Sequence, residues 1–178
     1  SLYADDTESI SSYSRDVVLT MQNIVTFGKA SGCRLNHTKT KGLMILNNTS
    51  KQLYQHLKDQ VPQISWNEDV GLKVLGIHFF ADPLQTENYN WTKAIGKLKK
   101  KFEVLKKRNL SLKGKVVLLN TVALSKIWFI SNVLRLPQWA FKEIEALIFD
   151  FLWDTTGSEL LKRQTLYLAL NNGGLGIL

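Results

Sequence analysis

The sequence changes character near Asp82 and Pro83, and this change constrains the fold more than any other feature. Before it, short apolar runs alternate with polar stretches. After it, from Trp91 onward, apolar residues recur at the spacing of one helix face while lysines fill the other positions. The apolar residues of this face are Ile95, Leu98, Phe102 and Leu105. We therefore expect an α+β chain, with a mixed part at residues 1–82 and a helical part at residues 83–178.

The first part is predicted to combine short strands with two helices. A hairpin with Thr7 to Ile10 as its return strand leads into a helix that begins at Ser12 or Ser14 and ends at Gly32. The further elements expected here are a strand at Leu43–Leu46, a helix at Ser50–Lys58, and a strand or tight hairpin at Leu72–Phe80. Within the last of these, Gly76 marks a bulge or a close approach of the backbone.

The second part is predicted to contain three helices. The lysine-rich helix comes first, and Ser111 caps the next one, whose stretch from Val116 to Leu134 is apolar enough to be central and buried. Pro137 ends that helix. A third helix then carries Phe141, Ile144, Ile148 and Leu152 towards Trp153, and a short strand or turn at Thr165–Leu170 is closed by Gly173, Gly174 and Gly176.

Positive charge is concentrated in the lysine-rich helix and the turn after it. The 178 residues carry a formal net charge of +8, which favours a polyanionic partner. Between Lys93 and Lys115 stand ten Lys or Arg residues and one acid, Glu103, a local net charge of +9, so the rest of the chain sums to −1. Such a localised charge is typical of a contact with a phosphate backbone, although a solvated lysine face is the alternative.

Cysteine content and hydropathy favour an intracellular protein, nuclear or cytoplasmic and not secreted. Cys33 is the single cysteine, so a disulfide framework is excluded and a reducing compartment is expected. The most apolar stretch, Val116–Leu134, is interrupted by Asn120, Lys126 and Asn132, so no membrane span is expected. Because the chain starts without Met, inside an expected strand, we expect it to be a piece of a longer protein.

The opening residues Tyr3-Ala4-Asp5-Asp6 combine an apolar lead-in with two adjacent carboxylates. Carboxylate oxygens presented at a turn suit a hard divalent cation such as Mg²⁺, the metal of nucleotidyl transfer. The same residues are also ordinary turn chemistry, because Asp and Thr side chains bond to nearby backbone donors. By themselves they leave both interpretations open.

Three segments in order resemble successive motifs of reverse transcriptases, most closely those of LINE-type (non-LTR) retrotransposons. They are Tyr3–Asp6, Ser31–Thr40 and Val74–Ile77, which match the catalytic Tyr/Phe-Ala-Asp-Asp turn, the Leu-Asn-x-x-Lys-Thr segment and the Leu-Gly hairpin. Further matches to the thumb and its following segment are Leu110–Lys115 with Leu119-Asn120, Leu136-Pro137, Phe151–Trp153 and Gly173–Gly176. The resemblance implies the C-terminal part of a polymerase palm at 1–82, with a short antiparallel sheet and packed helices, and a mainly α-helical thumb with its following connection at 83–178.

The resemblance also implies roles for the residues of the acidic turn and the next loop. Asp5 would be a ligand of a Mg²⁺ pair, with Asp6 its neighbour in the same turn, and bound cations would keep the pKa of each carboxyl low. Tyr3 would lie near the primer end or the incoming nucleotide; a core aromatic is its alternative. Lys39 would neutralise or protonate the departing pyrophosphate, unless it is only an exposed loop lysine. Asn36 and Gly32 are expected to shape that loop.

Further implied roles fall on the hairpin and the thumb. Leu75, Gly76 and Ile77 would form the primer grip, with a core strand as the local alternative. His78, which follows, is expected to be structural. The backbones of an RNA template and a DNA primer would be held by Lys97, Lys100, Lys101, Lys113 and Lys115.

The implied function is RNA-directed DNA synthesis, in which a DNA primer is extended on an RNA template with deoxynucleoside triphosphates. Two-metal transfer needs a further carboxylate, which the family supplies from an upstream palm strand, so we expect this chain alone to be catalytically incomplete. One alternative is a noncatalytic basic nucleic-acid-binding module from a decayed element. Another is a helical interaction domain, which would show no steep salt dependence of RNA or DNA binding. No specific protein partner is indicated.

Overall fold

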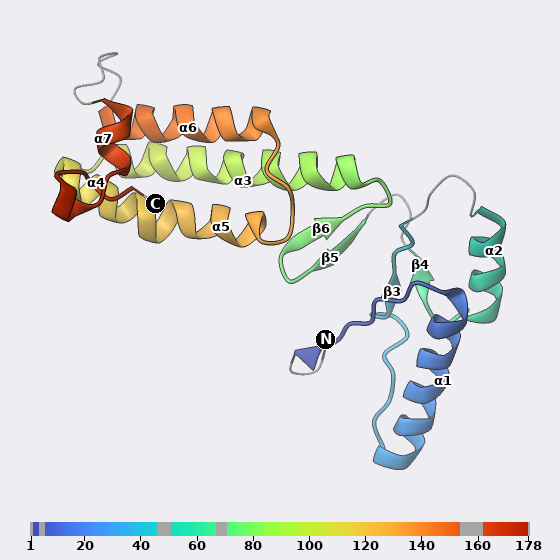
Figure 1. The fold of residues 1–178 in the computed structure, drawn as a ribbon. Helices are drawn as coiled ribbons and strands as arrows, with labels where there is room; N and C mark the ends of the chain where they lie inside the picture. Colours follow the sequence, from blue (N-terminus) through green and yellow to red (C-terminus); the bar gives the residue numbers. More distant parts are fainter. Residues whose placement is uncertain (1, 4–5, 46–50, 67–70, 154–161, 178) are drawn as a thin grey trace. The chain divides into compact units, whose positions relative to one another are not determined.

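A computed structural model describes residues 2–3, 6–45, 51–66, 71–153 and 162–177 (Figure 1). The chain divides into two compact units, Ser1–Pro83 and Leu84–Leu178. This division falls one residue beyond the boundary expected from the sequence. The first unit combines helices with short strands, and the second is helical in its described residues.

The first unit contains two helices and three two-stranded sheets. The elements in chain order are β1 (Leu2–Tyr3), β2 (Asp6–Thr7), α1 (Ser14–Ser31), β3 (Lys41–Gly42), α2 (Lys51–Gln60), β4 (Ser65–Trp66), β5 (Leu72–Val74) and β6 (Ile77–Phe79). Strands β1 and β2 pair antiparallel, as do β5 and β6, whereas β3 and β4 pair in parallel, so the expected antiparallel pairing does not hold for β3 and β4. The return strand of the first hairpin is therefore shorter than the predicted Thr7–Ile10.

Helix α1 begins and ends where the sequence predicts. Gly32 follows its last residue with φ of 76°, and its N–H donates to the carbonyl of Gly28 at 3.0 Å. Glycine adopts this left-handed conformation without the steric cost that a Cβ brings. At the other end, Tyr13 occupies the cap position without a side-chain hydrogen bond to the helix. Ser14 is the first helical residue, so the predicted start at Ser12 or Ser14 is confirmed at Ser14.

The core of the first unit is small. Met21, Leu57 and Val61 are its buried members. Packed against them are the partly buried Val17, Val18, Ile24, Leu35, Met44, Ile64 and Trp66. The core thus joins one face of α1 to α2 and to the strand pair β3–β4.

The observed strand β3 precedes in the sequence the strand that was predicted at Leu43–Leu46. Lys41 and Gly42 form β3, paired with Ser65 and Trp66, and residues 43–45 are not in a strand; Leu46 lies outside the described residues. A Cβ on Gly42 would lie 2.7 Å from the Trp66 ring. The glycine therefore permits the close approach of the indole, a contact that the apolar run from Leu43 did not indicate.

The second unit is built from helices α3 (Pro83–Lys106), α4 (Leu112–Leu118), α5 (Ser125–Ser131), α6 (Gln138–Trp153) and α7 (Arg163–Tyr167). A π-helical stretch, η1 (Leu119–Leu124), connects α4 to α5, and a 3-10 turn, η2 (Leu170–Asn172), follows α7. Helix α3 begins before the predicted start near Trp91. The predicted strand or turn at 165–170 is instead the end of α7 and the start of η2.

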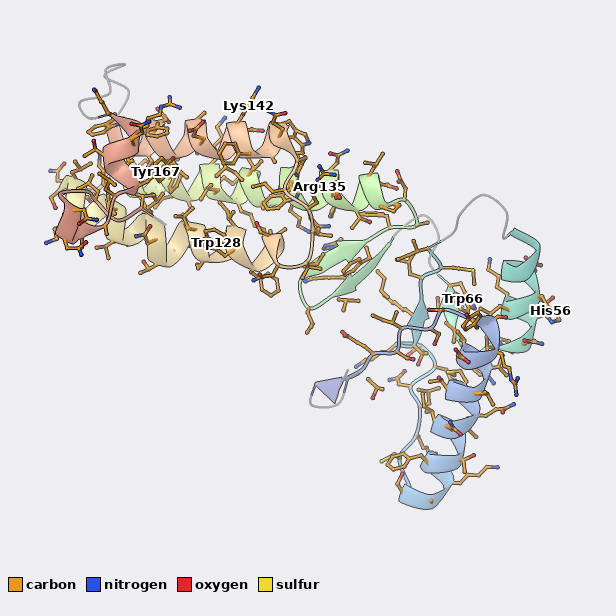
Figure 2. The ribbon with its side chains drawn as sticks, in the orientation of Figure 1. His56, Trp66, Trp128, Arg135, Lys142 and Tyr167 are labelled. Atoms are coloured by element: carbon orange, nitrogen blue, oxygen red, sulfur yellow. The ribbon has the colours of Figure 1, made fainter. Side chains whose placement is uncertain are left out.

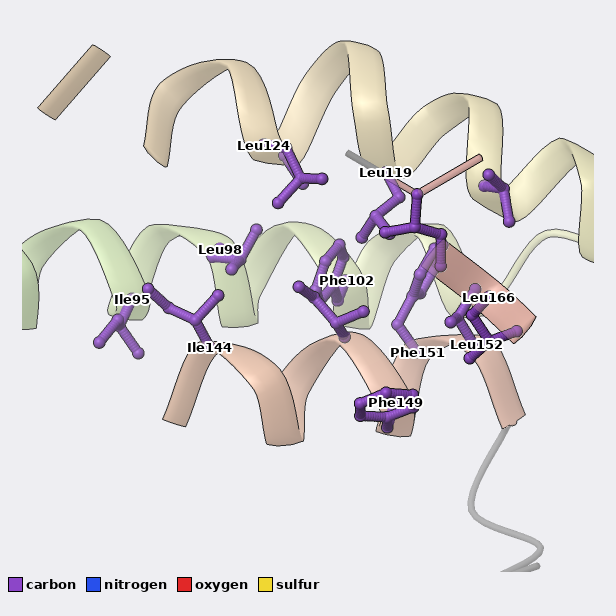
Figure 3. Packing of buried hydrophobic residues seen from close by; sticks show 14 of the residues in the cluster. Ile95, Leu98, Phe102, Leu119, Leu124, Ile144, Phe149, Phe151, Leu152 and Leu166 are labelled. Atoms are coloured by element: carbon purple, nitrogen blue, oxygen red, sulfur yellow. The ribbon is translucent and has the colours of Figure 1, made fainter. Parts of the chain in front are cut away.

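Helix α3 supplies the central face of the core in the second unit. Its buried side chains include Trp91, Ile95, Leu98 and Phe102, and they pack with buried side chains from α4, η1 and α6 (Figure 3). The rings of Phe102 and Phe151 stack with centroids 4.5 Å apart and planes 8° from parallel. The predicted apolar face of this helix is confirmed.

Polar contacts fix the ends of these helices. Trp91 is fully buried, and its Nε1–H donates to the carbonyl of Arg135 at 2.8 Å, in the segment after α5. The predicted cap at Ser111 is confirmed, since its Oγ accepts a bond from the N–H of Gly114 at 3.2 Å. From η1, the amide of Asn120 donates to the carbonyl of Gly176 at 2.8 Å, which ties the C-terminal segment to the bundle.

The segment predicted to be central and buried, Val116–Leu134, is buried on one side only. Its inward residues, such as Leu119 and Leu124, belong to the core, but Trp128 and Phe129 are exposed. The segment packs against neighbours along one face, and the periodic apolar pattern did not show that its other face carries aromatic rings. The helical stretch also ends at Ser131, ahead of Pro137, after which α6 begins.

One described helical stretch, Leu112–Ser131, is long and apolar enough to cross a membrane by length and composition alone. A core helix of a soluble protein meets the same two criteria. This stretch contributes Val116, Leu119, Ala123 and Leu124 to the core of the second unit.

Replacing Phe102 with Ala should destabilise the second unit by about 3–5 kcal/mol, because the change removes a buried ring and leaves a cavity beside Phe151. The matched variant Val104→Ala, two residues along α3 at an exposed position, should change stability by no more than about 0.5 kcal/mol. Urea unfolding followed by circular dichroism measures both. Equal effects of the two substitutions would contradict the packing described for α3.

Candidate functional site

The acidic hairpin is formed by the backbone of the first residues. Tyr3 pairs with Asp6 across β1 and β2, so only Ala4 and Asp5 connect the two strands. Asp5 lies outside the described residues, and the structure describes only the backbone of Tyr3 and Asp6. Within the described part of the chain, no three His, Cys, Asp or Glu side chains gather where they could hold a metal. The roles of Asp5 and Asp6 as Mg²⁺ ligands and of Tyr3 at the substrate stay predictions.

The loop that carries Lys39 is organised by Asn36. The Oδ1 of Asn36 accepts bonds from the hydroxyl of Thr38 at 2.7 Å and from the N–H of Lys39 at 3.2 Å. The carbonyl of Asn36 accepts from the N–H of Lys39 at 3.1 Å and from the N–H of Thr40 at 3.0 Å. This is the loop-shaping role that the sequence predicted for Asn36. The hydrogen bonds to Asn36 fix the backbone of Lys39, whereas the side chain of Lys39 is exposed.

The predicted primer grip is a tight hairpin turn. Val74 pairs with Ile77, so Leu75 and Gly76 form a two-residue connection between β5 and β6. Both have positive φ, 46° for Leu75 and 92° for Gly76. Two positive φ values define the turn type whose twist matches that of the flanking strands. The predicted bulge is therefore a hairpin turn, while the contact with a primer stays a prediction.

The lysines of α3 lie away from its core face. Lys97 and Lys100 are exposed and Lys101 is partly exposed, whereas Leu98 and Phe102 beside them are buried. Lys113, in the first turn of α4, is also exposed. These four predicted phosphate contacts are therefore accessible to a large polyanion.

Lys115 does not belong with these four residues. Its side chain is buried, with 6% of the residue exposed, and its Nζ donates to the carbonyl of Leu152 at 3.1 Å. The ammonium also lies 5.8 Å from the centre of the Phe151 ring. The prediction that Lys115 holds a nucleic-acid backbone is corrected here: its ammonium joins α4 to α6 inside the bundle, where a phosphate backbone does not reach.

Lys106 is engaged in a similar way at the surface. Its Nζ lies 2.6 Å from the carboxylate of Asp150, so α3 is bridged to α6 by an ion pair. The pair is partly exposed and contributes at most about 1 kcal/mol. Its main consequence is that the charge of Lys106 is locally compensated, unlike that of Lys97 or Lys100.

The positive surface extends beyond the stretch that was predicted from the sequence. Residues 104–142 contain eight Lys or Arg residues and no acid. Six of the eight are exposed: Lys107, Arg108, Lys113, Lys126, Arg135 and Lys142. The positions of Arg135 and Lys142 can be followed in Figure 2. The absence of Asp and Glu from this stretch was the signal that would have revealed the extension beyond Lys115.

The chain is similar in sequence to a transposon protein. No family model matches the sequence. The chain is 27% identical, over 185 aligned residues, to the "Transposon TX1 uncharacterized 149 kDa protein" of Xenopus laevis. The alignment covers 94% of this chain and 13% of the Xenopus protein, so the chain spans a small part of that relative. The similarity supports a common origin with a transposon protein.

Substitutions at Leu75 and at Gly76 in the hairpin turn should change the stability of the first unit in opposite directions. Leu75→Asn should stabilise the first unit by about 1 kcal/mol, because Asn tolerates a positive φ better than Leu does. Gly76→Ala should destabilise it by about 1 kcal/mol through backbone strain alone, since a Cβ there meets no atom within 4 Å.

Calorimetric unfolding of the whole chain measures both changes. Gly96→Ala is the matched control, because Gly96 is an exposed glycine inside α3 with equally open surroundings. There the same substitution should stabilise by about 0.5–1 kcal/mol. If Gly76→Ala also stabilised the protein, the turn geometry would be refuted.

Proposed function

We propose that this chain is the C-terminal palm and thumb portion of an RNA-directed DNA polymerase from a LINE-type retroelement. The ordered resemblance of Tyr3–Asp6, Ser31–Thr40 and Val74–Ile77 to reverse transcriptase motifs supports this proposal. So does the similarity to a transposon protein along nearly the whole chain. The partners in the proposal are an RNA template and a DNA primer, with deoxynucleoside triphosphates as the substrates of the whole enzyme.

One observation carries the nucleic-acid part of the proposal: α3 is apolar on its buried face and positive on its exposed face. Lys97, Lys99 and Lys100 stand within four residues of each other, all exposed, and Glu103 is the one acid between Lys93 and Lys115. Like charges at this spacing repel, which destabilises an isolated helix. A phosphate backbone on this face offsets that repulsion, and the binding free energy comes largely from release of its counterions.

The catalytic part of the proposal assigns a role to each candidate residue. Asp5 and Asp6 would hold Mg²⁺, which when bound neutralises phosphate charge during nucleotidyl transfer. Lys39, held by the Asn36 turn, would bring its ammonium to the leaving pyrophosphate and neutralise or protonate it. Tyr3 would contact the nucleotide or the primer end, and Leu75–Ile77 would position the primer.

The resemblance implies that the chemistry also requires a carboxylate from an upstream palm strand. The proposal therefore treats Asp5 and Asp6 as one part of a metal site. Nucleic-acid binding by the thumb, in contrast, is a property that the 178 residues should show without any further segment.

The salt dependence of binding to an RNA–DNA hybrid tests that property. Log affinity falls as log salt rises, and the triple variant Lys97→Gln, Lys100→Gln and Lys113→Gln should make this fall less steep. The magnitude of the slope should decrease by about 2–3, at about 0.9 per lost phosphate contact. The control variant replaces Lys29, Lys73 and Lys162 with Gln, which removes three exposed lysines from other parts of the chain. Its slope should stay close to that of the unmodified protein.

Fluorescence anisotropy with a labelled hybrid provides both slopes. A flat salt dependence of the unmodified chain would contradict the proposed thumb and favour a helical interaction domain. Equal slope changes in the two triple variants would show that the charge acts through the whole molecule and not through the α3 face.

A further inference from the structure

Helix α5 presents two aromatic rings to solvent. Trp128, which is labelled in Figure 2, is 53% exposed, and Phe129 is 49% exposed. Their neighbours Ile127 and Ile130 are partly buried and pack against the core of the second unit, so the rings lie on the opposite side of the helix. Large aromatic side chains on a surface are typical of a binding site when cations accompany them.

Cations do accompany these rings. Lys126 is exposed and stands three residues before Phe129, which places it on the same side of the helix. Arg135, in the segment that follows α5, is exposed as well. Because residues 104–142 contain no acid, nothing in the local sequence offsets this positive charge. Aromatic faces beside exposed cations complement the bases and the phosphates of a nucleic-acid strand.

We propose that the outward face of α5 binds single-stranded nucleic acid, with unpaired bases stacked on Trp128 and Phe129 and a phosphate held by Lys126. Stacking requires unpaired bases, so this surface distinguishes a single strand from the duplex that the α3 lysines bind. The inference rests on the proposed function for its setting, since a polymerase template is single-stranded before it is copied.

The composition of the face favours a nucleic-acid strand over a membrane. Ser125 and Asn132, both exposed, lie four residues before Phe129 and four residues after Trp128 on the same side of the helix. A helix that lies in a membrane surface requires a continuous apolar face, which these polar side chains interrupt. Hydroxyl and amide groups beside aromatic rings instead suit contacts with phosphates and sugars.

Anisotropy with labelled oligouridylate tests the proposal on the whole chain. Trp128→Ala should weaken binding of the oligonucleotide about 5- to 150-fold at every salt concentration, the range expected for the loss of one stacked base. The slope against salt should not change, because no phosphate contact is lost. Trp128→Phe, which keeps a ring, should retain most of the affinity.

Trp139→Ala is the matched control, because Trp139 is 40% exposed in the same acid-free region but lies on α6. It should leave binding unchanged, and circular dichroism should show that every variant is folded. Equal weakening by both tryptophan variants, or none by Trp128→Ala, would overturn the proposal.

Two further measurements separate this proposal from its competitors. If Trp128→Ala lowered binding to phosphatidylserine-containing vesicles but not to oligouridylate, α5 would be a membrane surface and the proposal would fail. If Trp128→Ala left the affinity for oligouridylate unchanged while the affinity for the hybrid still depended on the α3 lysines, only this proposal would fail. Loss of salt-dependent binding to both nucleic acids would instead refute the proposed function.

Discussion

Burial of one face of α3 is the constraint on which the second unit depends. Trp91, Leu98 and Phe102 fill the space between this helix, the α4–α5 stretch and α6, and the stack of Phe102 on Phe151 lies within that core. Because these residues must face inward, the positions between them face solvent, and lysines occupy several of those positions. The charge of the surface is therefore set by the same helical period that builds the core.

The basic residues of this unit divide into two kinds by their contacts. Lys115 and Lys106 bond to α6, one to a backbone carbonyl in the interior and one to Asp150 at the surface. Lys97, Lys100 and Lys113 remain accessible, and these are the residues to which a phosphate-binding function is assigned. In the first unit Lys39, Leu75 and Gly76 lie on turns, where local hydrogen bonds or positive φ values fix the backbone.

Features that depend on a few neighbouring residues could be predicted from the sequence. The stop at Gly32, the cap at Ser111 and the hairpin at Leu75–Gly76 each follow from local backbone chemistry. The burial of Lys115 could not, because it depends on the carbonyl of Leu152, which lies far along the chain. The exposure of Trp128 could not be predicted either, since an apolar segment does not reveal which of its faces lacks a neighbour. The role of Lys39 came from the resemblance alone, and the carboxylate of Asp5 by itself left open both a metal ligand and an ordinary turn residue.

The central claim is the proposal that Asp5 belongs to the metal site of a polymerase. Mg²⁺-dependent primer extension on an RNA template tests it most directly, with this chain alone, with the longer polypeptide that adds the upstream palm, and with the Asp5→Asn variant of the latter. We predict extension only by the unmodified longer polypeptide, with hybrid affinity unchanged in the variant. Robust extension by this chain alone, or by the Asp5→Asn variant, would contradict the claim.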